Sequence, residues 1–181
     1  MPKKVLLDSK KIDIILNRLV CQLVENHKDF NNTVLIGLQP RGIFLIEKIL
    51  EIFKKNYPYI NIDTGILDFT FFRDDFRRSK KTLKASSTQM NFSVENKDVV
   101  LIDDVLFTGR SIKAAMSSMD SYGRPNSIEL LVLIDRRYKR EIPIQANYCG
   151  AKIDTFKGDR VNVVWNKNSD KNVIYLSLIH I

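Results

Sequence analysis

Two spacings of apolar residues alternate along the chain. Over residues 9–27 apolar side chains recur at three- and four-residue steps, which predicts an amphipathic helix with Ser9 as its N-cap. Similar patterns predict helices over 43–55 and 111–122, the second closed by Gly123 and Pro125. Apolar runs predict strands at 33–38, 60–72, 99–102 and 128–134, and shorter β segments at 161–165 and 173–176.

Strands and helices that alternate in this way are typical of an α/β fold. Right-handed crossovers then give a twisted, mainly parallel sheet with helices on both faces. Residues 73–96 are polar and show no period. Because more than about 20 residues is long for a connection, we expect a lid or a binding element there.

Composition limits the class of protein. A length of 181 residues suits one compact domain. No apolar run approaches the roughly 20 residues of a membrane span, and the N-terminus lacks the apolar segment of a signal peptide, so we expect a cytoplasmic protein with no membrane partner. The net charge of +8 leaves nucleic acid open as a partner, although lysines spread over a solvated surface give the same charge.

The strongest chemical signal follows the strand predicted at 99–102. Asp103 and Asp104 come next, and Thr-Gly-Arg-Ser at 108–111 opens a helix. The N–H groups of a helix N-terminus, two hydroxyls and a glycine that lets the backbone approach closely suit a phosphate, whereas paired carboxylates suit the hydroxyls of a sugar. This segment therefore predicts a ribose 5-phosphate site. The alternative, an acidic N-cap without a ligand, leaves the Thr-Gly-Arg-Ser turn unexplained.

Residues 99–111 resemble the phosphoribosyl diphosphate (PRPP) signature of type I phosphoribosyltransferases. Four further motifs match one branch, the pyrimidine operon attenuator and uracil phosphoribosyltransferase family, PyrR, in order and spacing. They are Leu35-Ile-Gly-Leu-Gln-Pro-Arg-Gly42, Phe72-Arg-Asp-Asp75, Tyr122-Gly-Arg-Pro125, and Leu133-Ile-Asp-Arg136 with Glu141-Ile-Pro-Ile144. The resemblance implies one type I phosphoribosyltransferase domain over 1–181, with a flexible lid at about 73–96 and a small hood at about 136–181 that includes the N-terminal segment.

The resemblance also implies a role for the loop after the first apolar strand. Leu38, Gln39 and Gly42 look like the pyrophosphate loop, in which Arg41 would hold the leaving diphosphate with its guanidinium fork. Without the family context, a plain turn is the alternative for this loop. Arg73, at the mouth of the lid, would meet the diphosphate on closure, and a solvated charge cluster is the alternative there.

The PRPP signature supplies the remaining candidates. Asp103 and Asp104 would hold the ribose hydroxyls, and magnesium would be held mainly by PRPP with an indirect contribution from these carboxylates. The residues expected to line the rest of the PRPP site are Val105, Leu106, Phe107, Thr108, Gly109, Arg110 and Ser111.

One position bears on the choice of base. Purine-salvage relatives often carry a carboxylate where this chain has Phe107, and an aromatic ring cannot accept a proton. A pyrimidine is therefore favoured, with the hood segment around 152–160 as the expected base pocket. The resemblance implies a uracil phosphoribosyltransferase that converts uracil and PRPP to UMP and diphosphate without a covalent nucleophile. A phosphoribosyltransferase for another nucleobase is the alternative.

Family membership would imply a second role, UMP-dependent binding of pyrimidine-operon messenger RNA in transcription attenuation. The basic side chains that could contribute are Arg18, Arg77, Arg78, Lys80, Lys81, Lys84, Arg136, Arg137, Lys139 and Arg140. The presumed RNA face departs from the family at Cys21, at Gln145, at Ala151 and by one inserted residue within 135–141. The enzymatic role is therefore favoured, attenuation stays open, and an RNA-binding attenuator with little catalysis is the alternative. A homodimer or a higher homo-oligomer is expected.

Overall fold

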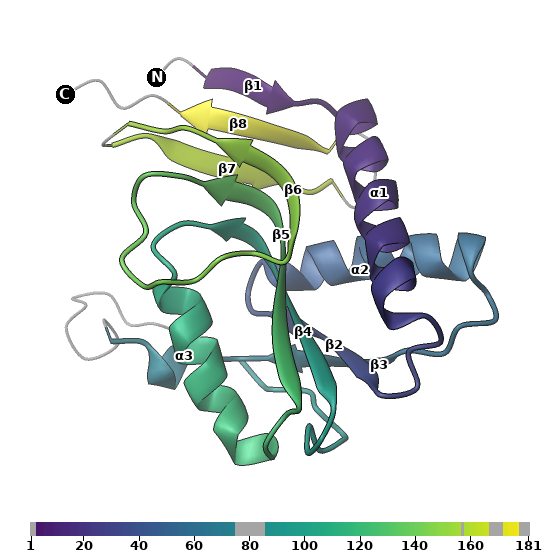
Figure 1. The fold of residues 1–181 in the computed structure, drawn as a ribbon. Coiled ribbons are helices and arrows are strands. Elements are labelled where there is room, and N and C mark those ends of the chain that lie inside the picture. The colour runs from purple at the N-terminus through teal and green to yellow at the C-terminus, as the bar shows by residue number, and fades with distance from the viewer. Residues whose placement is uncertain (1–2, 75–85, 157, 167–171, 178–181) are drawn as a thin grey trace.

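The computed structural model describes residues 3–74, 86–156, 158–166 and 172–177. Its centre is a five-stranded parallel sheet in the order β3-β2-β4-β5-β6. These strands are β3 (Asp63–Leu67), β2 (Thr33–Leu38), β4 (Asp98–Leu106), β5 (Ser127–Arg136) and β6 (Tyr148–Ile153). Helices α1 (Ser9–His27) and α2 (Gly42–Asn56) cover one face and α3 (Arg110–Met119) the other, as Figure 1 shows. The predicted α/β fold is confirmed.

The sheet forms because its central strands are apolar on both faces. All six residues of β2 are buried, as expected for a parallel strand covered by helices on both sides. Helix α1 buries the stripe that its spacing predicted, from Ile12 to Leu23. The prediction of Ser9 as its N-cap is wrong, because Asp8 has the extended backbone and its carboxylate accepts the Lys11 N–H at 2.9 Å.

The strand predicted over 60–72 is correct only in its middle part. β3 ends at Leu67, and Thr70–Phe72 form a short 3-10 helix, η1, in which Phe71 and Phe72 are exposed. Asp68 accepts the Thr70 N–H at 2.7 Å, which turns the chain out of the sheet. Periodicity alone cannot show where a short apolar run leaves the sheet, so the run at 69–72 predicts strand although it forms η1.

The helix predicted over 111–122 is confirmed for most of its length, since α3 is followed by the 3-10 helix η2 (Asp120–Tyr122). Gly123 then has φ +119°, a backbone conformation that favours glycine. The strand predicted at 99–102 is longer than expected: β4 runs on through Asp103 and Asp104 to Leu106. Both carboxylates therefore belong to a central strand.

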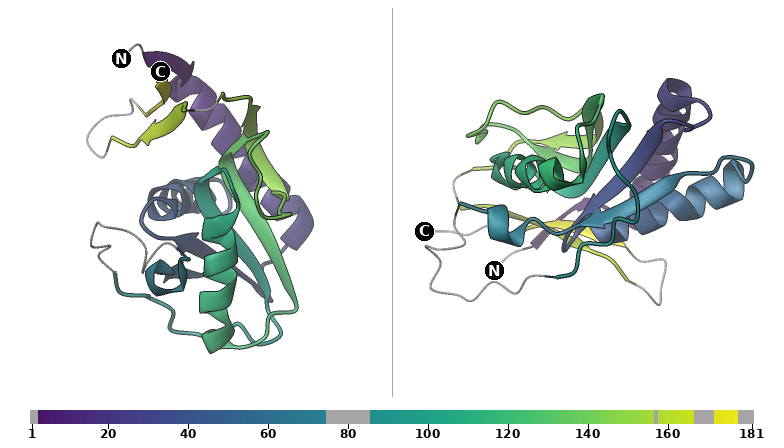
Figure 2. Two further views of the ribbon diagram at one scale, coloured as in Figure 1. Left: turned by 90° about the vertical axis from the view of Figure 1, so that its left-hand side faces the viewer. Right: turned by 90° about the horizontal axis from the view of Figure 1, so that it is seen from below.

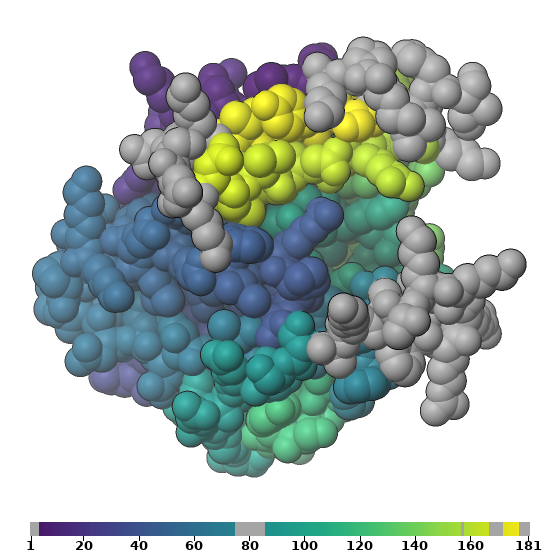
Figure 3. All heavy atoms as spheres, turned by 180° about the vertical axis from the view of Figure 1, so that it is seen from behind, coloured from purple at the N-terminus to yellow at the C-terminus, as the bar shows by residue number. Residues whose placement is uncertain are grey.

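A second, antiparallel sheet joins the two ends of the chain in the order β1-β8-β7. It consists of β1 (Lys3–Leu7), β8 (Val173–Ser177) and β7 (Arg160–Val164). Figures 1 and 2 show it set apart from the main sheet, and from behind β7 and β8 lie directly above α2 (Figure 3). Val161, Ile174 and Leu176 share one core with α1 and α2. The division into lid and hood stays a prediction, and β6 pairs in the main sheet.

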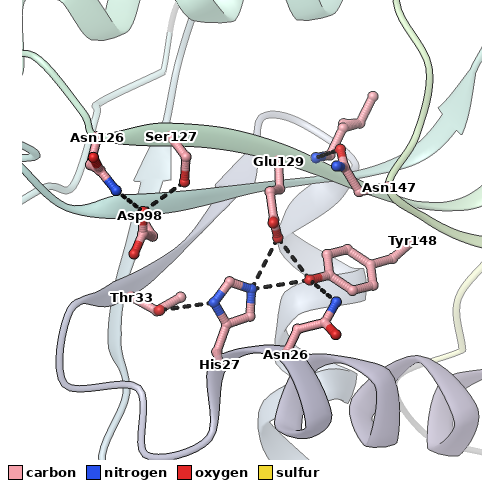
Figure 4. A network of polar contacts seen from close by, with 10 residues as sticks. Asn26, His27, Thr33, Asp98, Asn126, Ser127, Glu129, Asn147 and Tyr148 are labelled. Atoms are coloured by element: carbon pink, nitrogen blue, oxygen red, sulfur yellow. Dashed lines mark hydrogen bonds and ion pairs between the residues drawn. The ribbon is translucent and has the colours of Figure 1, made fainter.

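A polar network lies at the end of the main sheet where β2 and β5 begin, opposite to the end that carries the two carboxylates of β4 (Figure 4). His27 Nε2 lies 3.0 Å from Glu129 Oε2 and 3.1 Å from the Tyr148 hydroxyl, while Thr33 Oγ1 lies 3.0 Å from His27 Nδ1. The Tyr148 hydroxyl donates to Glu129 at 2.7 Å, and burial raises the pKa of Tyr148 to about 12. The network ties α1 to three strands near their amino ends, whereas Asp103 and Asp104 lie toward the carboxyl end of β4. None of the described helices is long and apolar enough to cross a membrane.

Candidate active site

The N-terminus of α2 packs directly against β4 at the level of the two carboxylates. This contact needs glycine at position 42, because a Cβ there would collide with the Ile102 carbonyl oxygen and lie 3.4 Å from the Asp103 Cα. The preceding loop is thereby held beside the strand, and its Gln39–Pro40 peptide bond is cis. Arg41 Nη1 lies 3.9 Å from Asp104 Oδ2, with the arginine side chain 56% exposed. The predicted pyrophosphate loop and the carboxylate pair therefore meet.

The two carboxylates differ in their partners. Asp103 Oδ1 accepts the Asp104 N–H at 2.8 Å. The Asp104 side chain is only 5% exposed, and its Oδ2 is buried without a hydrogen-bond partner among the described residues. Burial raises the pKa of Asp104 against the opposing effect of Arg41, and burial together with the neighbouring Asp104 charge raises the pKa of Asp103 well above 3.8. A buried acceptor without a donor suits a hydroxyl that a ligand would bring.

The turn after β4 leads into α3, and its Arg110 N–H makes a long hydrogen bond of 3.4 Å to Thr108 Oγ1. Gly109 is the N-cap of α3 and has φ +88°, which favours glycine. The N-cap residues of α2 and α3, Arg41 and Gly109, make no side-chain hydrogen bond to their helices, whereas Asp8 caps α1 with its carboxylate. Two helix N-termini with positive partial charge therefore flank the carboxyl end of β4.

Residues 140–142 close over this turn. The N–H groups of Glu141 and Ile142 both donate to the Thr108 carbonyl, at 2.9 and 3.0 Å. The Arg110 guanidinium, half exposed, donates to Glu141 and to Asp74, and these two carboxylates raise the pKa of Arg110. The phosphate turn is thus connected both to the start of the predicted lid and to the segment after β5.

Arg73 lies beside the turn at 108–111. It shares a cavity of about 120 Å³ with Asp74, Thr108, Arg110 and Ser111. Its predicted contact with the diphosphate on lid closure stays a prediction.

The predicted lid is held from residue 86 onward by Asp68, which directly follows β3. Its carboxylate accepts the N–H groups of Thr70 and Ser86, and its own N–H donates to Thr88 Oγ1 at 3.1 Å. The Gln39 side chain donates to the Ser87 carbonyl at 2.8 Å, which links the far end of the lid to the pyrophosphate loop.

Comparison with known proteins identifies this arrangement. Residues 3–166 match the family described as Phosphoribosyl transferase domain. The bifunctional protein PyrR of Desulfosudis oleivorans is 36% identical over 174 residues, covering 94% of both chains, and that of Caldicellulosiruptor bescii is 38% identical over 172 residues, covering 94% of this chain and 93% of the relative. The chain belongs to the PyrR family of phosphoribosyltransferases. The crystal structure of the hypoxanthine phosphoribosyltransferase of Trypanosoma cruzi, at 14% identity, shares the fold with a TM-score of 0.68 over 94% of this chain and 95% of the other.

Within this PyrR family member, two candidate residues have side chains that face the core. Leu38 is fully buried and Leu106 is 1% exposed, so a ligand could reach only their backbone atoms. Phe107, by contrast, has its ring 3.7 Å below the Arg136 guanidinium.

The basic residues considered for RNA have different surroundings. Arg136 is buried, which removes it from any RNA surface, and Arg18 donates to the carbonyl groups of Cys149 and Gly150 at 2.9 and 2.5 Å. Arg137 pairs with Asp154, and Arg140 pairs with Asp135. Arg77, Arg78, Lys80, Lys81 and Lys84 lie outside the described residues.

Sequence reasoning missed several residues that shape the site. Asp68 anchors the lid, Glu141 pairs with Arg110, and Arg140 donates to the Phe107 carbonyl. Glu141 belongs to a motif that the resemblance had matched, Glu141-Ile-Pro-Ile144, so its position in the PyrR pattern was a usable signal. Arg140 lies in the segment 135–141, which departs from that pattern by one inserted residue, and was considered only for RNA. Nothing local in the sequence distinguishes Asp68 from an ordinary turn residue.

Proposed function

We propose that the site at the carboxyl end of β4 binds PRPP and transfers its ribose 5-phosphate to uracil, giving UMP and diphosphate. The observation that carries the proposal is the buried Asp104 Oδ2, which has no donor among the described residues although it lies between two helix N-termini. A ribose hydroxyl supplies the missing donor, and the phosphate groups at either end of PRPP suit the helix N-termini.

Different residues of the site would hold different parts of PRPP. The turn at 108–111 would hold the 5-phosphate with its N–H groups and hydroxyls, and Asp103 and Asp104 would accept hydrogen bonds from the ribose hydroxyls. Arg41 and the loop N–H groups would hold the diphosphate. As the bond to diphosphate breaks, negative charge grows on the leaving oxygen, and preorganised donors at that point lower the barrier. Closure of the lid with Arg73 would exclude water from the reacting carbon.

The site fits magnesium, but it offers the ion few protein ligands. The nearby protein ligands are two carboxylates, and among the described residues no group of three or more His, Cys, Asp or Glu side chains could hold a metal. Oxygen donors suit magnesium, which keeps several positions for water and substrate oxygens. When bound, the ion would neutralise charge on the diphosphate, while Asp103 and Asp104 would orient it through the ribose hydroxyls.

The base would lie beside Phe107 and the hood segment around 152–160. The aromatic ring offers an apolar surface and no proton acceptor, which favours a pyrimidine over a purine. Uracil is therefore the proposed base.

Regulation of pyrimidine genes through RNA is the proposed second function, as for the bifunctional relatives. A recess of about 450 Å³ near the end of β5 supports it, because its lining carries Arg137, Arg140 and Lys152 together with the single carboxylate of Asp135. Counterion release from such residues would give salt-dependent affinity for RNA. We propose a cytoplasmic homodimer or higher oligomer for this function.

A competition assay tests the catalytic proposal. Protein, magnesium and PRPP are incubated with equal concentrations of uracil, hypoxanthine and orotate, and the nucleotide products are separated. UMP should dominate; a different nucleotide, or none, contradicts the proposal. For the second function, affinity for a pyrimidine-operon leader should rise with UMP and fall with salt, and affinity equal to that for scrambled RNA contradicts it.

A further inference from the structure

Arg136 occupies an unusual environment for an arginine. It is the last residue of β5, and its side chain is buried, with the residue 7% exposed. Its Nε and Nη2 donate to Thr155 Oγ1 at 3.2 and 3.1 Å, and Nη2 also donates to the Asp159 carbonyl at 2.9 Å. These acceptors are a hydroxyl and a backbone carbonyl rather than carboxylates, and burial lowers the pKa of Arg136. Burying a guanidinium is costly unless the charge is paired and hydrogen-bonded, and here the Asp159 charge only partly opposes the effect of burial.

The other face of the guanidinium meets the PRPP signature. The Arg136 Cζ lies 3.7 Å from the centre of the Phe107 ring, which is a close cation–π distance in a desolvated site. The Phe107 carbonyl accepts a hydrogen bond from Arg140, so the ring and the backbone of this residue are both held by arginines. Phe107 is the residue that stands in place of a carboxylate next to the base.

The hydrogen bonds of the same arginine to Thr155 and Asp159 lie in the segment expected to form the hood. The Phe156 N–H donates to Asp159 Oδ2 at 2.8 Å, and the Asp159 N–H donates back to the Phe156 carbonyl at 3.3 Å. Thr155 and Asp159, which accept from Arg136, are buried at 6% and 8% exposure. One side chain therefore connects the two parts of the chain that are expected to enclose the base.

We propose that Arg136 is a positioning residue for uracil, which holds the Phe107 ring in fixed relation to Thr155 and Asp159 of the expected hood so that a single-ring base fits between them. This inference rests on the proposed uracil transfer. Arg136 acts through Phe107 and the two hood residues rather than by contact with the reacting atoms.

The test is steady-state kinetics on Arg136→Met, Arg136→Lys and Phe107→Leu, with Arg124→Met as the matched control. Arg124 is exposed and lies after α3, at the other end of the sheet. Arg136→Met should raise KM for uracil about tenfold or more, because hydrogen bonds from a charged group are lost, while KM for PRPP changes less than about threefold. Arg136→Lys keeps the charge without the planar fork. Its KM for uracil should therefore lie between those of the unsubstituted protein and Arg136→Met. Arg124→Met should match the unsubstituted protein.

A double-substitution cycle separates positioning from a general structural effect. If Arg136 acts through Phe107, the effects of Arg136→Met and Phe107→Leu on uracil KM should be less than additive in the double variant. Additive effects, an unchanged uracil KM in a folded Arg136→Met protein, or equal increases in both KM values would overturn the inference.

Three further outcomes separate this inference from the proposed function. Should Arg136→Met not fold, Thr155→Val, which removes one acceptor and keeps the arginine, should still raise uracil KM selectively, and an unchanged uracil KM in that variant overturns the inference. Failure of the unsubstituted protein to form UMP overturns the proposed function and this inference with it. Normal UMP formation with an unaffected Arg136→Met variant overturns this inference alone.

Discussion

Replacement of Asp104 by asparagine should raise the stability of the protein while it removes activity. A buried charge without a hydrogen-bond donor costs about 1–3 kcal/mol or more. The attraction to Arg41, at 3.9 Å from a guanidinium that is 56% exposed, offsets at most about 1 kcal/mol, because exposed charges are screened. The neutral amide should therefore stabilise the folded protein by about 1–2 kcal/mol at pH 7. At about 2–4 °C per kcal/mol for a chain of this length, Tm should rise by about 2–8 °C.

The pH dependence of this effect has a defined sign. The folded-state pKa of Asp104 is raised above 3.8, so the folded protein binds the proton more tightly than the unfolded chain does. Stability then falls as pH rises from near 4 through the folded-state pKa and is constant above it. The advantage of Asp104→Asn should consequently be small below pH 4 and largest at neutral pH. Thermal unfolding of the unsubstituted protein and of Asp104→Asn, followed by circular dichroism from pH 3.5 to 8, measures both stabilities.

Asp98→Asn is the matched control, since Asp98 lies at the other end of β4. Its carboxylate accepts hydrogen bonds from Ser127 and Asn126, both at 2.7 Å, and these donors lower its pKa. The stabilisation that ionised Asp98 gives is present above the unfolded-state pKa of this residue. It is lost as pH falls through the lower folded-state pKa. Asp98→Asn should therefore destabilise the protein at pH 7. An Asp104→Asn protein that is natively folded yet less stable than the unsubstituted protein at pH 7 would refute the reasoning.

Three further predictions concern packing and charge. Gly42→Ala should destabilise the protein by about 2 kcal/mol or more, as overpacking does, because its Cβ would meet the Ile102 carbonyl; an unchanged urea midpoint contradicts this. Tyr148→Phe should cost about 1–2 kcal/mol, because Glu129 loses a buried donor, and urea unfolding that shows no loss contradicts the role of the network in Figure 4. Arg41→Met should lower kcat/KM about 100-fold with Tm nearly unchanged, since the side chain is exposed and its role is with the diphosphate; a normal rate contradicts that role.

Much of the fold was predictable from local pattern. Strands such as β2 are buried along their whole length and read as apolar runs, while α1 has a regular stripe of apolar residues. Local pattern alone therefore located both elements. β1 and β6 were missed because their pattern is weak: β6 alternates buried and half-buried residues around Gly150, and β1 is completed only by pairing with β8 from the other end of the chain. Long-range pairing of this kind leaves little local signal.

The candidate site was predictable only in part, for a related reason. Asp103 and Asp104 follow an apolar run and precede a glycine-containing turn, so their chemistry can be read locally. The role proposed for Arg136 cannot be read locally, because its acceptors Thr155 and Asp159 lie 19 and 23 residues away in the sequence. From composition alone Arg136 counted as one more surface charge, whereas the structure buries it.

Calorimetric titration with PRPP in the presence of magnesium tests the central assignment most directly. The account predicts saturable binding of one PRPP per chain to the unsubstituted protein and weaker binding to Asp104→Asn, with Asp98→Asn like the unsubstituted protein at a temperature where all three are folded. Absence of binding heat at several temperatures, or equal affinity of the Asp104→Asn variant, would contradict it.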